Sequence, residues 1–372
     1  MTNAAIHRIG VIGGGMMGQG IALDFALAGR NVTLYNTRPQ TSDRALAGIE
    51  RALDLLIETD LTTPAGATAA LGRLTRTTLL AAAAADHDLI VETVLEDLDL
   101  KRQIFRDLER HAPPGAILAT DTSSLPVDAI AEACARPERV LAMHNFHPAH
   151  LVPLVEVGLG RRTDPTVVAV ACRLLEMCGK RPLVIERPLP GFLGNRLQNV
   201  LRNEALRLVE DGQATPEQID QAISMGVARK YSIVGIFDRM DLVGLDLAAR
   251  VFESIGTPVP APIADHVARG EYGVRTGRGF YDWPEGAVEA LQDHLDRHLI
   301  HLLKLDRAAG RVRVPSPYTC TWSCFRRSTK YRVPATTQIG MSSRFTKGML
   351  TNPKQTTPSP AVPGRPRLMT PN

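Results

Sequence analysis

Cysteine and aromatic residues are scarce in this sequence of 372 residues, and long apolar runs are absent from it. The five cysteines are odd in number and include no CxxC pair. This pattern argues against a disulfide framework and favours a reducing compartment, for which we expect the cytoplasm. No segment approaches the ~20 apolar residues that cross a bilayer. The N-terminus enters an apolar strand pattern within about ten residues, so we expect no signal peptide.

Acidic residues are missing from the C-terminal end of the chain. From Arg307 onward the sequence holds twelve of its 43 Lys and Arg residues and none of its 39 Asp and Glu residues, so the net charge of +4 leaves residues 1–306 at −8. The body is mildly acidic, and we expect neither nucleic acid nor a membrane as its partner. The basic end is rich in Pro, Ser, Thr and Arg without periodicity, so residues 301–372 are predicted to be a disordered tail.

Short apolar strand patterns alternate with helical patterns in the first half of the chain. We expect strands near 9–12, 32–35, 87–94, 115–124, 139–146 and 181–187, and a long helical region near 43–84. Such alternation predicts an α/β fold with a doubly wound, parallel Rossmann sheet. Beyond residue 187 the pattern is helical only. The sequence therefore predicts a Rossmann domain at 1–187 and an all-helical domain at 188–300.

A glycine turn follows the first predicted strand. Gly13, Gly15 and Gly18 satisfy G-x-G-x-x-G between a strand and a helix, the context in which this motif binds a dinucleotide pyrophosphate. The second strand should end in an acid that holds the adenosine ribose, but Asn36 stands there, with Arg38 near by. NAD is the expected cofactor, and NADP is the alternative because a carboxylate that would repel its 2′-phosphate is absent.

Three histidines recur at intervals of three in "MHNFHPAHLVPLVEVG" (residues 143–158). His144, His147 and His150 would converge on a metal only in a helix, which Pro148 disfavours. An acid–base pair needs only a histidine and a carboxylate to orient it, and Glu156 follows His144 by twelve positions. We therefore predict an acid–base pair and no metal, and we expect His150 on the loop surface.

The motifs together resemble the L-3-hydroxyacyl-CoA dehydrogenase family over residues 7–283. They include "GVIGGGMMGQGIA", "VETVLEDLDLKRQIFRDLE", "TDTSSLPV", "HNFHPAHLVPLVEV", "PGFLGNRLQNVLRNEALRLVEDG", "DLVGLD" and "TGRGFYDW". The resemblance implies an NAD-dependent oxidoreductase whose helical domain forms a homodimer. It implies a short-chain 3-hydroxyacyl-CoA such as 3-hydroxybutyryl-CoA as substrate, in fatty acid metabolism.

Site residues follow from the same resemblance. Catalytic roles fall on His144, Glu156, Ser123 and Asn195. Cofactor contacts fall on Gly13, Gly15, Met16, Met17, Gly18, Asn36, Arg38, Glu96, Lys101, Ser123, His147 and Arg275. His147 stands where the family's "HFFNP" motif has asparagine.

One departure concerns the CoA end of the substrate. Where CoA-using relatives carry serine and lysine, this chain has Ala52 and Thr59, beside Asp54, Glu58 and Asp60. An acidic, lysine-free helix suits CoA phosphates poorly. A dehydrogenase of a CoA-free 3-hydroxy acid, similar to the gulonate or carnitine enzymes, is the alternative. A catalytically silent dinucleotide-binding protein is the alternative from another class, and retention of all four catalytic residues argues against it.

Overall fold

A computed structural model describes residues 6–187 and 189–311. The chain divides into two compact units, one ending at Glu210 and the other beginning at Asp211. The predicted disorder of residues 312–372 lies outside the described residues. Across the described part, no helix combines the length and the apolar character that crossing a membrane requires.

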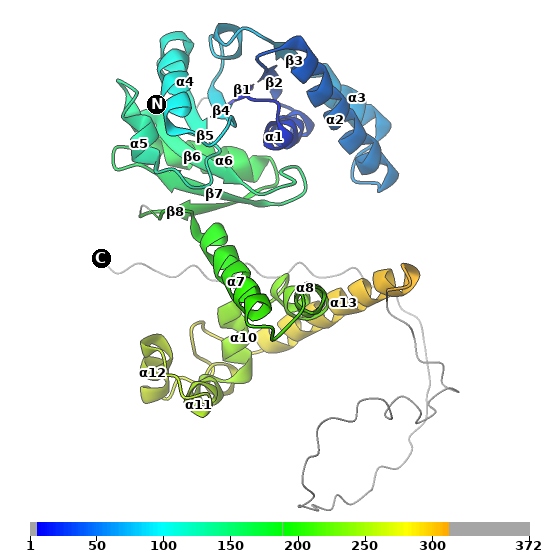
Figure 1. The fold of residues 1–372 in the computed structure, drawn as a ribbon, viewed down its shortest axis with the longest axis vertical. Helices are drawn as coiled ribbons and strands as arrows, with labels where there is room; N and C mark the ends of the chain where they lie inside the picture. Colours follow the sequence, from blue (N-terminus) through cyan, green and yellow to red (C-terminus); the bar gives the residue numbers. More distant parts are fainter. Residues whose placement is uncertain (1–5, 188, 312–372) are drawn as a thin grey trace, which may run out of the picture. The chain divides into compact units, whose positions relative to one another are not determined.

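The first unit is built on one eight-stranded sheet (Figure 1). Its strands lie in the spatial order β3-β2-β1-β4-β5-β6-β7-β8. All neighbouring strands run parallel except β6 and β7, which are antiparallel. The first six strands therefore have the Rossmann order, and β7 and β8 extend it at one edge. The bounds are β1 Arg8–Ile12, β2 Asn31–Tyr35, β3 Leu74–Thr77, β4 Leu89–Glu92, β5 Ile117–Thr120, β6 Val140–Asn145, β7 Leu154–Leu159 and β8 Arg181–Ile185.

Helices cover both faces of this sheet. Successive strand residues point to opposite faces, and the two core clusters follow that alternation. Val91 packs in the cluster that contains residues of α1, α2, α3 and α6. Ile90 packs in the cluster that contains residues of α4 and α5. The bounds are α1 Met16–Leu27, α2 Pro39–Glu58, α3 Pro64–Gly72, α4 Leu98–His111, α5 Val127–Ala131, α6 Pro165–Met177 and α7 Leu193–Glu210, with short 3₁₀ turns η1 Ala81–Ala83 and η2 Pro137–Arg139.

Two strands of the sheet are missing from the sequence prediction. The long helical region predicted near 43–84 is wrong beyond α3, because "LTRT" forms the strand β3. This edge strand is only half-buried and lacks the apolar run by which central strands are identified. The second missing strand, β7, contains a glutamate within its apolar residues. Its antiparallel pairing with β6 is the one departure from the predicted parallel, doubly wound sheet among the described strands.

Local sequence explains where several helices of the first unit begin. Asp97 accepts a hydrogen bond from the Leu100 N–H at the start of α4. Thr63 and Asp164 cap α3 and α6 in the same way, each followed by a proline at the first helical position. These residues satisfy donors that a helix leaves unpaired at its N-terminus. Loops and helices therefore join at positions that the sequence specifies.

The second unit is helical in its described residues. Its elements are α8 Pro216–Ala222, the π-helical turn η3 Ile223–Val227, α9 Ala228–Tyr231, α10 Ile236–Val243, α11 Leu245–Ser254, α12 Ala261–Ala268, the 3₁₀ turn η4 Val274–Thr276 and α13 Ala287–Ala308. Helix α13 runs through residue 300, where the sequence analysis places the start of the tail.

A buried aspartate connects two sequence motifs of the second unit. Asp241, from "DLVGLD", is fully buried. Its carboxylate accepts hydrogen bonds from the backbone N–H groups of Phe280 and Tyr281 and from the Trp283 indole, at 2.9–3.0 Å. A Cβ at Gly279 would overlap that carboxylate. The motif "TGRGFYDW" is therefore held in place by Asp241.

Candidate active site

The glycine turn joins β1 to α1 at the carboxyl end of the sheet. Gly13 has φ +112°, a conformation that favours glycine, and a Cβ at Gly18 would overlap the Gly13 carbonyl oxygen. Gly15 has open space where a Cβ would stand, and it begins α1 without a side-chain cap. The exposed Met16 and the half-buried Met17 follow it. This arrangement leaves helix N–H groups accessible to a pyrophosphate.

Asn36 lies directly beyond β2 and contacts the glycine turn. It is buried, and its Oδ1 accepts a hydrogen bond from the Gly14 N–H at 3.1 Å. Its Nδ2 is also buried and has no partner among the described residues. An unpaired buried donor beside a phosphate-binding turn fits a bound ribose hydroxyl. The predicted neighbour Arg38 is exposed at the start of α2.

His144 and Glu156 form a buried pair across β6 and β7. The two residues are register partners, and His144 Nδ1 lies 2.8 Å from Glu156 Oε2. The other carboxylate oxygen accepts the Gly194 N–H at 2.8 Å. Because a carboxylate accepts, Nδ1 carries the hydrogen, and Nε2 is the ring nitrogen that can take a proton. The structure therefore brings together the two residues predicted as an acid–base pair.

Aromatic side chains fix the plane of the imidazole. Phe192 stacks on His144 with ring centroids 4.9 Å apart and an interplanar angle of 23°. Phe146 contacts the imidazole at a centroid distance of 4.8 Å. A Cβ at Gly158 would overlap the Phe192 ring. The glycine after "PLVEV" is thus required for this stacking, and Phe192 itself holds φ +50°, which is uncommon for a bulky residue.

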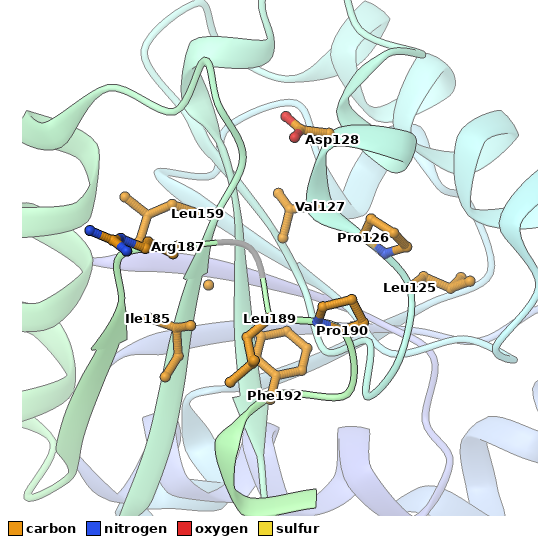
Figure 2. A pocket seen from close by; sticks show the side chains of 11 residues that line it. Leu125, Pro126, Val127, Asp128, Leu159, Ile185, Arg187, Leu189, Pro190 and Phe192 are labelled. Carbon is orange, nitrogen blue, oxygen red and sulfur yellow. The ribbon is translucent and has the colours of Figure 1, made fainter. Parts of the chain in front are cut away.

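Phe192 also lines a small cavity near the edge of the sheet. Figure 2 shows its ring beside Leu189 and Pro190, with Val127 and Leu159 across the cavity. The cavity has a volume of about 50 Å³ and a mainly apolar lining. Ligand pockets usually measure about 300–1,000 Å³. The cavity is too small for a nicotinamide or an acyl-CoA, so we do not assign it to substrate.

The loop after β5 presents Ser123, and Glu96 anchors this loop. Glu96 Oε1 accepts hydrogen bonds from the Ser123 and Ser124 N–H groups and from the Thr122 and Ser124 hydroxyls, at 2.6–3.0 Å. Burial alone would raise the pKa of Glu96, but the bonds from Thr122 and Ser124 outweigh it and hold the pKa below its ordinary value. Glu96 therefore supports the serine loop as a carboxylate.

Asn195 meets the same loop from the first turn of α7. Its Nδ2 donates a hydrogen bond to the Ser123 carbonyl oxygen at 3.2 Å. The preceding residue, Gly194, donates to Glu156. The start of α7 is thereby tied to the serine loop and to the acid–base pair. The four predicted catalytic residues are linked by hydrogen bonds in two pairs, His144 with Glu156 and Ser123 with Asn195.

Lys101 lies deeper than a cofactor contact would require. It is 1% exposed, and its Nζ lies 2.7 Å from Glu92 Oε1 and 3.5 Å from Glu96 Oε2. Glu92 was not predicted as a site residue. The only signal for it in the sequence is a glutamate that ends the apolar run "LIVE" at β4.

The other predicted residues are more dispersed. His147 is exposed, whereas His150, expected on the loop surface, is half-buried with its Nδ1 away from solvent. Burial, followed by the charges of Lys180 and His147, lowers the pKa of His150.

Within residues 6–187 and 189–311, no three His, Cys, Asp or Glu side chains gather as a metal ion would need. Arg275 lies in the second unit, where it pairs with Asp246.

A buried lysine holds the histidine-containing loop against the sheet. Lys180 Nζ donates to the carbonyl oxygens of Ala149 at 2.5 Å and Val152 at 3.1 Å. It also lies 3.1 Å from Asp24 Oδ2 on α1. Burial raises the pKa of Asp24 to about 6, although Lys180 opposes the rise. Lys180 thus links the loop after His144 to the helix that begins at the glycine turn.

Two family models match the chain in sequence. The NAD-binding domain of 3-hydroxyacyl-CoA dehydrogenase matches residues 8–188, and the C-terminal domain of the same enzymes matches residues 191–283. The chain belongs to the 3-hydroxyacyl-CoA dehydrogenase family. It is an NAD-dependent oxidoreductase that acts on a CH–OH group of a small-molecule substrate.

Relatives within this family act on different substrates. The 3-hydroxybutyryl-CoA dehydrogenase of Mycobacterium tuberculosis is 36% identical over 75% of this chain and 99% of that protein. The L-carnitine dehydrogenase of Streptomyces coelicolor is 32% identical over 82% of this chain and 96% of that protein. The crystal structure of a 3-hydroxyacyl-CoA dehydrogenase from Archaeoglobus fulgidus is 28% identical, with a TM-score of 0.67 over 82% of this chain and 100% of that one. Both CoA-linked and CoA-free substrates therefore occur among the relatives.

Proposed function

We propose that the protein interconverts a short-chain L-3-hydroxyacyl-CoA, such as 3-hydroxybutyryl-CoA, and its 3-ketoacyl form. The observation that carries this proposal is the buried pair of His144 and Glu156, 2.8 Å apart. A pair of this kind removes a proton from a secondary alcohol, because imidazole titrates near neutrality and the carboxylate orients it.

Each residue of the site has a separate role in the proposed reaction. His144 Nε2 accepts the hydroxyl proton during oxidation, and Glu156 stabilises the imidazolium that results. The Ser123 hydroxyl and the Asn195 amide are suited to hydrogen-bond the substrate oxygen as it changes from alcohol to carbonyl. The glycine turn and Asn36 would hold NAD, which supplies the hydride acceptor when bound. In reduction the imidazolium returns its proton to the new alkoxide.

The CoA-free alternative is favoured by the outer surface of α2 and the turn that follows it. Asp54, Glu58, Thr59 and Asp60 are exposed there, at or beside the positions where CoA-using relatives carry serine and lysine. Carboxylates repel CoA phosphates by about 1 kcal/mol for each close pair in water. The second candidate function is therefore oxidation of a free 3-hydroxy acid, such as carnitine or gulonate.

Substrate comparison tests the two candidates. The measurement compares kcat/KM for 3-hydroxybutyryl-CoA with kcat/KM for free 3-hydroxybutyrate, gulonate and carnitine. The rate is read from the absorbance of NADH. We expect a preference for the thioester of more than about tenfold, which is about 1.4 kcal/mol of discrimination. A smaller preference would mean that CoA is scarcely recognised, and the free-acid function would replace our proposal.

We further propose that the protein forms a homodimer through its helical C-terminal part. Support comes from α7, which has no buried residue although it is 18 residues long. Leu197, Val200 and Leu201 are at least 50% exposed and recur at helical spacing. An uncovered apolar stripe of this kind is a common association surface. Sedimentation of Val200→Glu should yield a monomer, with Asn199→Glu, on the opposite side of the helix, as the matched control. A wild-type monomer would contradict this proposal.

We also propose a cytoplasmic location and a role in fatty acid metabolism. The location is supported by the cysteines, since Cys134, Cys172 and Cys178 are all unpaired among the described residues. The metabolic role depends on the thioester substrate and is tested by the same substrate comparison.

A further inference from the structure

A buried ion pair lies behind the serine loop. Glu92, at the end of β4, is 0% exposed, and Lys101, on α4, is 1% exposed. Lys101 Nζ donates to Glu92 Oε1 at 2.7 Å and to Oε2 at 3.0 Å. The Val94 carbonyl oxygen lies 3.4 Å from the same nitrogen. Four protein oxygens, including one of Glu96 at 3.5 Å, therefore surround an ammonium that has three hydrogens.

Glu92 joins three elements of the first unit. Besides Lys101 on α4, its carboxylate accepts the Thr120 hydroxyl from β5 at 2.7 Å and the Val94 N–H at 2.6 Å. Buried charges are tolerated when they are paired and fully hydrogen-bonded. Glu92 satisfies both conditions, so its position and that of Lys101 are strongly determined.

Glu96 connects the buried pair of Glu92 and Lys101 to the exposed serine loop. One of its oxygens faces Lys101 at 3.5 Å. The other accepts hydrogen bonds from Thr122, Ser123 and Ser124. Against the effect of burial, the hydrogen bonds from Thr122 and Ser124 and then the Lys101 charge lower the pKa of Glu96. An ionised carboxylate is the stronger acceptor for these donors. A continuous series of polar contacts therefore runs from Glu92 through Lys101 and Glu96 to the Ser123 N–H.

We propose that Glu92 is a positioning residue for Ser123. It fixes Lys101, whose charge holds Glu96 against the backbone of the serine loop. The family resemblance gives Lys101 a cofactor contact and gives Glu92 no role. Our inference is instead that the Lys101 charge keeps the serine loop in position through Glu96. It rests on the proposed function of Ser123 as a substrate contact.

Substitution of Lys101 alone would mix two effects. Lys101→Met leaves the Glu92 carboxylate buried without its cation, and breaking a buried pair in this way destabilises the fold. The double variant Glu92→Gln/Lys101→Met removes both charges, while the glutamine Oε1 can accept the Val94 N–H and its NH2 group can donate to the Thr120 hydroxyl oxygen. Its melting temperature should therefore exceed that of Lys101→Met. Glu96 remains without its cation in the double variant, so the effect on the loop persists.

The test combines amide exchange with kinetics. In the double variant the Ser123 and Ser124 amides should exchange about tenfold faster than in the wild type, because their acceptor is no longer fixed. We expect kcat to fall by about tenfold, with KM for NAD changed by less than about threefold. The control is Asp107→Asn/Arg110→Met, which removes an exposed pair from the same helix. It should change none of these quantities.

Two results in the double variant would overturn the proposal. Unchanged amide exchange and kcat in a folded double variant would make the pair purely structural. A large rise in KM for NAD with unchanged kcat would assign Lys101 to the cofactor. If the double variant does not fold, Glu92→Gln alone carries the test, and unchanged Ser123 and Ser124 exchange would overturn the inference. Absence of wild-type turnover on every substrate would refute the proposed function, while amide exchange would still report on Glu92.

Discussion

His144 and Glu156 face each other across the antiparallel strands β6 and β7, with Nδ1 and Oε2 2.8 Å apart. They are separated by twelve positions in the sequence, and the strand register alone places them opposite each other. Gly194 fixes the second carboxylate oxygen from the start of α7. The imidazole is thus oriented by a strand pair, a helix N-terminus and the stacked Phe192.

Glu156→Gln should lower kcat by about 10²–10⁴-fold, the usual range for a positioned acid–base group. Glutamine keeps the size of the side chain but no longer stabilises the imidazolium. Binding of NADH, measured by fluorescence titration, should change little because Glu156 is fully buried behind His144. A variant with wild-type kcat would show that the carboxylate is not needed for orientation.

Asn36→Asp should shift cofactor preference toward NAD. We expect the wild type to discriminate weakly against NADP, because Asn36 offers a donor at Nδ2 where a carboxylate would repel the 2′-phosphate. The measurement is the ratio of kcat/KM for the two cofactors, with the exposed Thr37→Ser as control. If the ratio does not move, residue 36 does not contact the ribose.

Asp24 should give the stability of the protein a pH dependence in mildly acidic solution. Burial raises its pKa to about 6, from an ordinary value of 3.8. The folded state then binds the proton more tightly, so this group makes the free energy of unfolding fall as pH rises through that window. The total effect is at most about 3 kcal/mol, from a shift of about two pKa units.

Urea unfolding of the wild type and Asp24→Asn between about pH 4 and pH 7 measures that contribution. The variant should gain stability relative to the wild type as pH rises. A difference in unfolding free energy that stays constant across the range would contradict the assignment to Asp24.

Deleting residues 312–372 should leave activity and melting temperature within error of the full chain. This prediction rests on composition alone, since the segment lacks apolar periodicity and acidic residues. The truncation begins after α13, which ends at Ala308. A fall in melting temperature on truncation would show that the segment packs on the folded part.

Much of the site could be predicted because its chemistry depends on local spacing. The glycine turn needs three glycines between a strand and a helix, and Gly13, Gly15 and Gly18 provide them. His144 and Glu156 were paired from residue type and separation. That the two residues lie directly opposite each other could not be predicted, because this depends on the strand β7. The sequence does not predict β7, since a buried glutamate interrupts its apolar pattern.

Glu92 could not have been predicted for a related reason. A glutamate at the end of an apolar strand has no sequence signal that distinguishes a buried ion pair from an exposed strand end. Lys101 on an amphipathic helix is equally ambiguous, because most lysines at such positions are exposed. Only the tertiary contact of β4, β5 and α4 reveals that both are buried.

The central claim is tested most directly by the oxidation of NADH with acetoacetyl-CoA, using wild-type protein and His144→Ala side by side. The wild type should turn over, and the variant should lose about 10²–10⁴-fold in kcat while it binds NADH with unchanged affinity. Near wild-type turnover by His144→Ala would contradict the acid–base role of the pair. A wild type that oxidises no NADH with this thioester or with the free keto acids would contradict the proposed function itself.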